Sequence, residues 1–294
     1  SNFPETPLVE GGNKRYYDEI YALPAGQTNW LAAGRLSRAV AEGMSATTAK
    51  GVVCVGGMAD GETLARVFLL AWDADRKQAV ETALPDFPCA VYLGAAAARG
   101  NRVYVAGGRG TEVLATDVWE LDLDDLSTGW CPLPQLPGAK GRMQAQAFVQ
   151  NGDQKCTLLY VVGGYARHDD GGFYSLVDGY AYDLAQADRA GVWFPVSPAV
   201  PKGSDMPAWP LIGAKCVTVG DQHALFFGGL DADYFDANQR KMATLEGAER
   251  EAQRIAYQSQ VPTSWNRRVL AYHTVTDRWF DLGEAPLLPT VAGA

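Results

Sequence analysis

Residues 52–57 read Val52-Val53-Cys54-Val55-Gly56-Gly57, an apolar, β-branched run that ends in two glycines. Runs of this composition and length are typical of buried strands. A double glycine lets the backbone turn with positive φ where a Cβ atom would clash. The first glycines of the four copies lie 51, 56 and 65 residues apart. The later copies are Val103-Tyr104-Val105-Ala106-Gly107-Gly108, Leu159-Tyr160-Val161-Val162-Gly163-Gly164 and Ala224-Leu225-Phe226-Phe227-Gly228-Gly229.

Three further strand signals recur around each double glycine. Short segments of small residues precede it, at Gly43–Thr48, Gly94–Ala98 and Gly213–Thr218. Aromatic and branched segments follow it, at Ala65–Asp73, Asp117–Asp122, Asp178–Asp183 and Arg267–Val275. Three units then carry a tryptophan beside proline or an aromatic residue, at Trp130, Trp193 and Trp279. One unit is thus a four-stranded blade, and the spacing is close to the kelch period of about 50 residues. The pattern predicts an all-β, kelch-type β-propeller whose innermost strands are small because they crowd the ring axis.

The repeats predict one propeller domain over residues 1–294, with an incomplete ring. Tyr16–Leu23 and Trp30–Ala33 read as the last two strands of a blade whose first two are absent, and 290–294 starts a new innermost strand. The chain is expected to carry about four and a half blades. Roughly one and a half blades, about 75 residues at the kelch period, are then missing.

Residues 235–264 interrupt the repeat. They are polar, contain alanine, and show neither a double glycine nor strand alternation. This pattern predicts one or two helices inserted after the fourth Gly-Gly. The insertion is either a lid or wall of a central pocket, or a plain surface or oligomer contact.

The charge balance excludes two classes of partner. With 25 basic and 34 acidic residues the formal net charge is −9, which argues against nucleic acid and against an anionic membrane surface. No apolar run approaches the roughly 20 residues of a membrane span. The opening Ser1-Asn2-Phe3-Pro4 is not a signal-peptide pattern, although a chain whose signal has been removed would look the same.

The five cysteines are predicted to be structural thiols. They are odd in number and scattered, and no C-x-x-C or Cys/His cluster occurs. No metal-ligand spacing is present, so neither a metal nor another cofactor is expected.

Two sets of loops are predicted to meet at one mouth of the ring. In a four-stranded antiparallel blade, the link between blades and the link between strands two and three emerge on the same face. Loops on a rigid scaffold are where a ligand binds, and several arginines there suit a carboxylate. Aromatic residues suit a sugar ring. The candidate binding residues are Arg38, Arg109, Arg142, Gln144, Arg167, Trp209 and Tyr234, with Glu42 a weak candidate for a general base.

Each candidate has a structural alternative. A single loop arginine is more often a solvated or inter-blade ion-pair residue, and the sequence favours a structural carboxylate at Glu42 over a general base. His168 beside Asp169 and Asp170 suggests a metal or acid–base pair only if these neighbours face one another.

The chain resembles the cyclically permuted mutarotase branch of the kelch proteins, relatives of N-acetylneuraminate epimerase. The resemblance is carried by the four Gly-Gly units, by Asn2-Phe3-Pro4 leading into Tyr17-Asp18-Glu19-Ile20-Tyr21, and by the insertion that ends in 268–272 and Asp277-Arg278-Trp279. It implies a six-bladed propeller that interconverts the anomers of sialic acid without a cofactor. It also implies a periplasmic or secreted location; self-association into a homo-oligomer stays open.

One part of the family pattern is absent. The family places its proposed catalytic glutamate in a Gly-Glu run followed by Pro-Gly and an arginine, and Gly283-Glu284-Ala285-Pro286 lacks the rest of it. By the order of blades the run is expected about 20 residues beyond Ala294. The sequence therefore leaves two functions open: a sialic-acid mutarotase, and a kelch module that binds a carbohydrate or protein without chemistry. A copper radical oxidase is disfavoured because its His/Tyr/Cys ligand set is missing.

Overall fold

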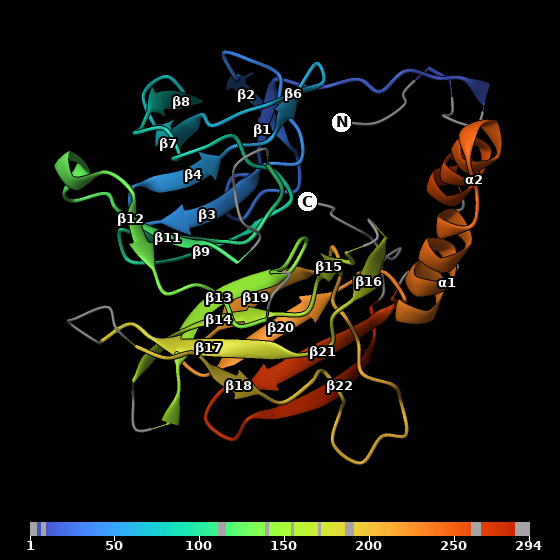
Figure 1. The fold of residues 1–294 in the computed structure, drawn as a ribbon. Helices are drawn as coiled ribbons and strands as arrows, with labels where there is room; N and C mark the ends of the chain where they lie inside the picture. The colour runs from blue at the N-terminus through green and yellow to red at the C-terminus, as the bar shows by residue number, and fades with distance from the viewer. Residues whose placement is uncertain are drawn as a thin grey trace.

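The computed structural model describes residues 5–6, 10–110, 116–138, 141–153, 156–169, 172–185, 191–259 and 266–285. These residues form four four-stranded antiparallel sheets, each a meander whose strands pair in chain order (Figure 1). The innermost strands β3 (Met44–Thr48), β9 (Ala95–Arg99), β13 (Gln146–Asn151) and β19 (Lys215–Val219) lie side by side in that order. The sheets are therefore consecutive blades of a propeller, as the repeats predict.

The first two blades follow the repeat closely. Blade 1 consists of β3 (Met44–Thr48), β4 (Gly51–Val55), β7 (Val67–Asp73) and β8 (Gln78–Ala83). Blade 2 consists of β9 (Ala95–Arg99), β10 (Arg102–Ala106), β11 (Val118–Asp122) and β12 (Cys131–Leu133), with a short 3-10 turn at Leu126–Thr128.

Blades 3 and 4 carry the longer insertions. Blade 3 consists of β13 (Gln146–Asn151), β14 (Thr157–Val162), β17 (Gly179–Asp183) and β18 (Phe194–Val196). Blade 4 consists of β19 (Lys215–Val219), β20 (His223–Phe227), β21 (Arg268–His273) and β22 (Arg278–Glu284).

A fifth, two-stranded sheet precedes blade 1. It pairs β1 (Glu19–Ala22) with β2 (Leu31–Arg35), and β2 lies beside β8. These are the two strands expected of a half blade. The innermost strand predicted at 290–294 lies outside the described residues.

Two small hairpins extend the loops that follow Gly-Gly, and the repeat pattern does not predict them. They pair β5 (Met58–Ala59) with β6 (Glu62–Thr63), and β15 (Tyr165–Arg167) with β16 (Phe173–Ser175). They give the post-Gly-Gly loops of blades 1 and 3 a fixed backbone.

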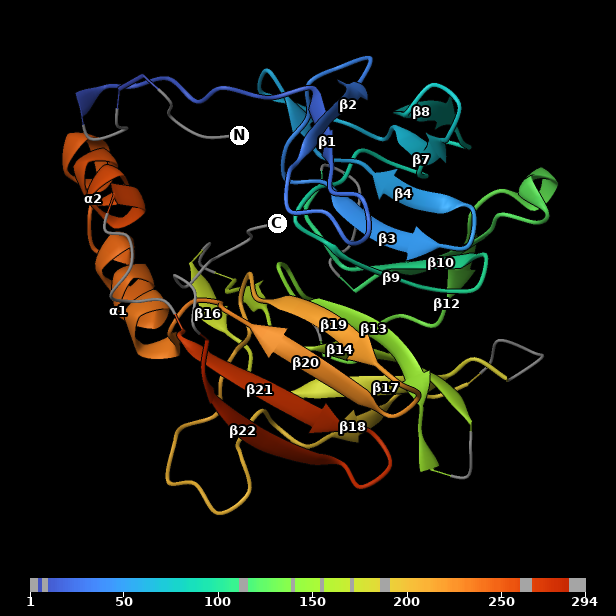
Figure 2. The same ribbon diagram turned by 180° about the vertical axis from the view of Figure 1, so that it is seen from behind.

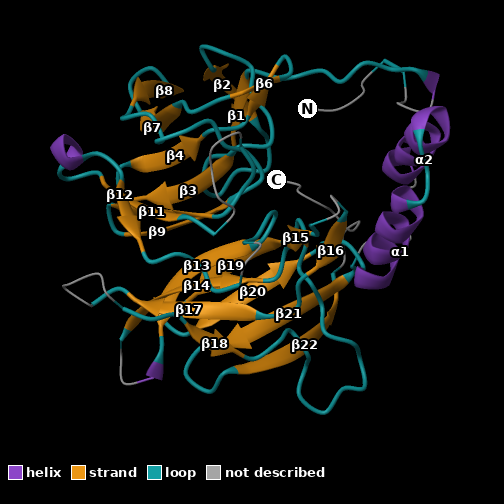
Figure 3. Cartoon of the chain, viewed as in Figure 1, coloured by secondary structure: helices purple, strands orange, loops and turns teal. Residues whose placement is uncertain are grey.

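Two helices occupy most of the region 235–264. Helix α1 (Ala232–Ala243) begins three residues before the predicted boundary, capped by the Asp231 side chain, which accepts a hydrogen bond from the Tyr234 amide. Helix α2 (Gly247–Ser259) follows after a short turn. Figures 2 and 3 show the pair as a helical column beside the otherwise β-strand molecule. No helix in the described ranges is long and apolar enough to cross a membrane.

The double glycines are inter-blade corners. The amide of the second glycine donates to a carbonyl of the next blade: Gly57 to Val91 (2.8 Å) and Gly164 to Pro210 (2.6 Å). A Cβ atom on the first glycine would meet the same carbonyl oxygen, at 2.2 Å for Gly56 and 2.1 Å for Gly163. Both glycines are required because the neighbouring backbone fills the space of a side chain.

The recurring tryptophans join the outer parts of the blades. Each indole N–H donates to a backbone carbonyl of the preceding blade: Trp130 to Pro85 (3.1 Å), Trp193 to Pro134 (2.9 Å) and Trp279 to Ser197 (2.8 Å). Apolar side chains of adjacent blades fill the space between, as where Phe226 and Tyr272 of blade 4 pack on Phe148 of blade 3.

A Gly163→Ala substitution should destabilise the protein severely. Its new Cβ atom meets the Pro210 oxygen at 2.1 Å at a φ of +64°. Gly203→Ala is the control, because Gly203 has a similar φ of +75° and no atom within 4 Å of the Cβ position. In urea unfolding, Gly163→Ala should lose about 3 kcal/mol more than Gly203→Ala. Equal losses of unfolding free energy would show that the positive φ alone destabilises Gly163→Ala, without a contribution from contact with the Pro210 oxygen.

Stability should fall on mild acidification because of a histidine pair. His223 and His273 face each other across β20 and β21, with ring centroids 4.6 Å apart. Burial and the neighbouring His223 lower the pKa of His273 below its ordinary value of 6.5. The unfolded chain then binds a proton more readily than the folded one, so stability is lost as the pH falls through about 6.5.

The expected result is a melting temperature that declines from pH 7.5 to pH 5 less steeply in His273→Gln than in the parent. His168→Gln, in an exposed loop, should follow the parent. A His273→Gln profile parallel to the parent would contradict the proposed coupling.

Candidate functional site

An arc of backbone hydrogen bonds follows the axis on one face. It is built from the residue two positions before each innermost strand: Glu42, Leu93, Gln144 and Gly213. The amide of each donates to the carbonyl of its counterpart in the preceding blade, Leu93 to Glu42 (3.0 Å), Gln144 to Leu93 (2.8 Å) and Gly213 to Gln144 (3.2 Å). We call these four residues the axial collar.

All four collar residues have positive φ: 59°, 57°, 49° and 64° in chain order. Three of them are not glycine, and each such residue costs of order 1 kcal/mol. Strained positions of this kind cluster at ligand sites. The collar therefore marks this mouth of the ring as a candidate site and presents the side chains of Glu42 and Gln144 to it.

The collar opens into a cavity of about 720 Å³ on the ring axis, the axial cavity. Glu42, Gln144 and Lys14 line it, together with the small residues that start the innermost strands. Glu42 is the one carboxylate in this lining among the described residues, and it forms an ion pair with Lys14. A carboxylate at the axis is one of the groups that can act as a general base.

A second cavity, of about 610 Å³, lies between the blade loops and the two helices; we call it the arginine pocket. Arg109, the first residue after Gly-Gly in blade 2, and Arg167, from the β15–β16 hairpin of blade 3, both line it. The Arg109 guanidinium lies over the Phe173 ring, 6.0 Å from its centroid. Helix α2 adds Arg250 and Arg254. Guanidinium groups pair bidentately with carboxylates, so this cavity suits an acidic ligand.

The helices are anchored to this face by specific contacts. Buried Phe235 of α1 packs on Tyr165, with centroids 5.2 Å apart, and Asp236 accepts hydrogen bonds from the amide (2.9 Å) and hydroxyl (2.8 Å) of Ser175. Gln253 of α2 donates to Asn238 of α1 (2.9 Å). The insertion is thus a wall of the arginine pocket.

Tyr165 interacts electrostatically with groups of both cavities, and it is not among the residues predicted from the sequence. Burial raises the pKa of its phenol to about 12, with Arg109 opposing the rise and Tyr92 and Glu42 adding to it. The hydroxyl is therefore within electrostatic reach of groups in both cavities. The available signal was its position, because Tyr165 directly follows the Gly-Gly of blade 3 as Arg109 follows that of blade 2.

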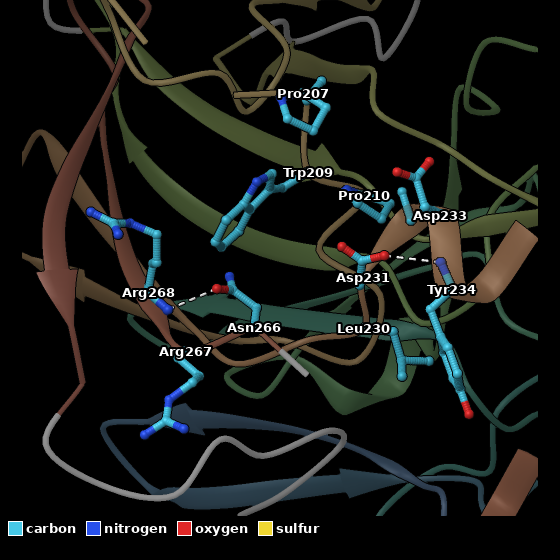
Figure 4. Close-up of a pocket in the computed structure, with 12 residues that line it drawn as sticks. Pro207, Trp209, Pro210, Leu230, Asp231, Asp233, Tyr234, Asn266, Arg267 and Arg268 are labelled. Carbon is cyan, nitrogen blue, oxygen red and sulfur yellow. Dashed lines mark hydrogen bonds between the residues drawn. The ribbon is translucent and has the colours of Figure 1, made fainter. Parts of the chain in front are cut away.

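Trp209 and Tyr234 belong to a third cavity of about 410 Å³, which also includes Asp231 and Asn266 (Figure 4). The Tyr234 side chain extends away from the Trp209 ring in this view. Its ring stacks on Tyr257 of the arginine pocket, with centroids 5.1 Å apart. The structure does not bring Trp209 together with Arg109 and Arg167, although the sequence predicts all three at one mouth.

The two remaining arginines make structural contacts. Arg38 forms an exposed ion pair with Glu62 of β6 (2.6 Å). Arg142 is only 3% exposed; its guanidinium donates to the carbonyls of Gly163 (2.9 Å) and Asp178 (3.1 Å) and forms an ion pair with the Asp178 carboxylate (2.8 Å). The prediction that Arg142 reaches the mouth is corrected: both terminal nitrogens of its guanidinium contact the Gly-Gly corner of blade 3 and Asp178 instead.

Residues 84–294 match the model of a protein family described as N-acetylneuraminate epimerase. The chain belongs to the N-acetylneuraminate epimerase family. An N-acetylneuraminate epimerase of Vibrio cholerae serotype O1 is 28% identical over 218 residues, which are 71% of this chain and 51% of that protein. One from Brucella suis is 28% identical over 231 residues, covering 75% and 53%.

Two further comparisons support the fold. A kelch domain-containing protein of Vibrio cholerae serotype O1 is 24% identical over 213 residues, 70% of this chain and 54% of that protein. The solved structure of YjhT superposes with a TM-score of 0.53 at 20% identity, over 71% of this chain and 56% of that one. The chain spans about half the length of the family members it matches.

Arg142→Met should lower stability far more than Arg38→Met. The first change removes several buried charge-assisted hydrogen bonds and should cost about 2–4 kcal/mol in urea unfolding. The second removes one exposed ion pair and should cost less than about 1 kcal/mol. A small loss of unfolding free energy in Arg142→Met would contradict a structural role and make Arg142 a candidate ligand contact again.

Proposed function

We propose that the protein acts as a sialic-acid mutarotase, interconverting the two anomers of N-acetylneuraminate by acid–base chemistry that needs no cofactor. Family membership supplies the substrate class, because the relatives are named for it. The observation that carries the proposal is the arginine pocket: Arg109 and Arg167 of consecutive blades line one cavity. In a protein of net charge −9, such a site favours an acidic ligand.

The chemistry of the sugar links this pocket to the axis. In a 2-keto sugar acid the carboxylate is attached to the anomeric carbon itself. A base for the anomeric hydroxyl must therefore lie close to the arginine that holds the carboxylate. The main chain of Arg109 lies beside the axial collar, because it pairs with Tyr92 (2.7 and 2.9 Å), which precedes Leu93.

We assign Glu42 as the base and the Tyr165 phenol as the proton donor of this proposal. Glu42 takes the proton of the anomeric hydroxyl while the ring oxygen is protonated, and the bond between that oxygen and the anomeric carbon breaks. The open-chain ketone then closes on its other face. With a pKa of about 12 the Tyr165 hydroxyl keeps its proton at neutral pH. Glu42 must exchange its contact with Lys14 for the substrate hydroxyl.

The Lys14–Glu42 ion pair also favours the second candidate, a propeller that binds a carbohydrate without chemistry. The Lys14 ammonium group contacts the Glu42 carboxylate in this structure, in the position that a sugar hydroxyl would have to take. Gly283-Glu284-Ala285-Pro286 also lacks the Pro-Gly and arginine that accompany the family's proposed catalytic glutamate. The two candidates differ in one measurable quantity, the rate of anomer exchange.

The test is proton NMR of freshly dissolved N-acetylneuraminate with the protein expressed from its complete reading frame. A mutarotase speeds the approach to anomeric equilibrium without moving the equilibrium ratio. Arg109→Gln and Arg167→Gln should each weaken sugar binding by about 10- to 100-fold, the value of a charge-assisted contact. Glu42→Gln should retain binding and lose exchange.

Each alternative outcome has a distinct meaning. Binding without faster exchange in the parent protein supports the carbohydrate-binding module. Exchange that survives Glu42→Gln excludes Glu42 as the base and points to the family glutamate. Unchanged binding in both arginine variants, with Arg38→Gln as the matched control, would remove the arginine pocket from the site.

A further inference from the structure

The arginine pocket holds more positive charge than a single carboxylate needs. Two of its arginines come from the blades, Arg109 and Arg167, and two from helix α2, Arg250 and Arg254. The helical pair is four residues apart, so both side chains project from one face of α2. The inserted helix and the propeller loops therefore present guanidinium groups to the same cavity from different sides.

These charges are largely uncompensated. Arg254 pairs with Glu251 (2.5 Å), and across the described part of the chain no aspartate or glutamate lines the cavity. No ion pair among the described residues involves Arg109, Arg167 or Arg250. Among the described residues, the four guanidinium groups that line the cavity and the Glu251 carboxylate sum to a charge of +3. One bound carboxylate reduces it only to +2.

The remaining lining is compatible with a substituted sugar. Asn238 is 9% exposed and is fixed by its hydrogen bond from Gln253, while Phe173 and Met242 give an apolar patch. A volume of about 610 Å³ falls in the range of small-molecule sites. The pocket thus has room for a group beyond the one that Arg109 and Arg167 hold.

We infer that the arginine pocket takes a sugar acid that carries a second anionic group, and that Arg250 of α2 recognises this second group. The inference rests on the proposed function for the first carboxylate only. The second anion has one of two sources, a phosphate on the same sugar or the carboxylate of a neighbouring acidic sugar. Both present oxygen anions to a guanidinium group in the same way.

Calorimetry with three probes tests this inference. The probes are N-acetylneuraminate, its 9-phosphate and its α2,8-linked dimer, titrated at low salt into the parent protein, Arg250→Gln and Arg240→Gln. Arg240 is an exposed α1 residue outside the pocket lining, so its variant removes the same charge from the helical insertion. The readout is the ratio of dianion to monoanion affinity.

The parent protein should bind at least one dianion about 10-fold or more tightly than the monoanion, as expected for one added charge-assisted contact. Arg250→Gln should bring this ratio close to one, and Arg240→Gln should keep it. Melting temperatures of both variants establish that the fold is retained. A preference for the phosphate or for the dimer identifies the source of the second charge.

Two results would overturn the inference: equal affinities for all probes in the parent, or an equal loss in Arg240→Gln, which would indicate only a long-range field. The proposed function fails separately. Dianion binding that depends on Arg250, without anomer exchange, refutes the mutarotase and supports the second-anion site. Anomer exchange without a preference for dianions supports the mutarotase and refutes the second-anion site.

Discussion

The whole ring depends on the close approach of two backbones at each Gly-Gly corner. The carbonyl of Val91 or Pro210 occupies the place of a Cβ atom on one glycine and accepts the amide of the next. This contact fixes the distance between blades at their inner ends, while the tryptophan hydrogen bonds fix it at their outer ends. The apolar side chains between the blades are then packed in a space of set width.

The candidate site follows from the same constraint. The residue after each Gly-Gly pairs with the residue before the collar, as Arg109 does with Tyr92 and Tyr165 with Met143. The corner that joins the blades therefore also places Arg109 and Tyr165 beside the mouth. The strained φ values of Leu93 and Gln144 are tolerated because collar bonds hold these residues from both sides, and the carbonyl of Glu42 accepts one such bond.

The repeat predicts most of the fold, because each blade repeats the same order of small, apolar and aromatic strands around a double glycine. The strand order and the helical region could be read from periodicity. The β5–β6 and β15–β16 hairpins could not, since two or three residues carry no period. For the site, the sequence identifies which loops share a face but not how far each side chain reaches. The sequence predicts both Arg142 and Arg109 at the mouth, yet the Arg142 guanidinium turns back to the Gly163 carbonyl. Trp209 lies in a different cavity from Arg109 and Arg167.

The joint between the half blade and blade 1 is made differently from the others. The first complete unit carries no tryptophan at the position that supplies the indole contact elsewhere. In its place, Glu81 of β8 accepts hydrogen bonds from the amide and hydroxyl of Ser37 and from Arg66. Burial opposes ionisation of this carboxyl group, but these donors outweigh it and lower the pKa of Glu81. The contacts between blades are therefore mainly apolar, and this one joint is ionic. Acid or high salt should weaken the ionic joint before the others.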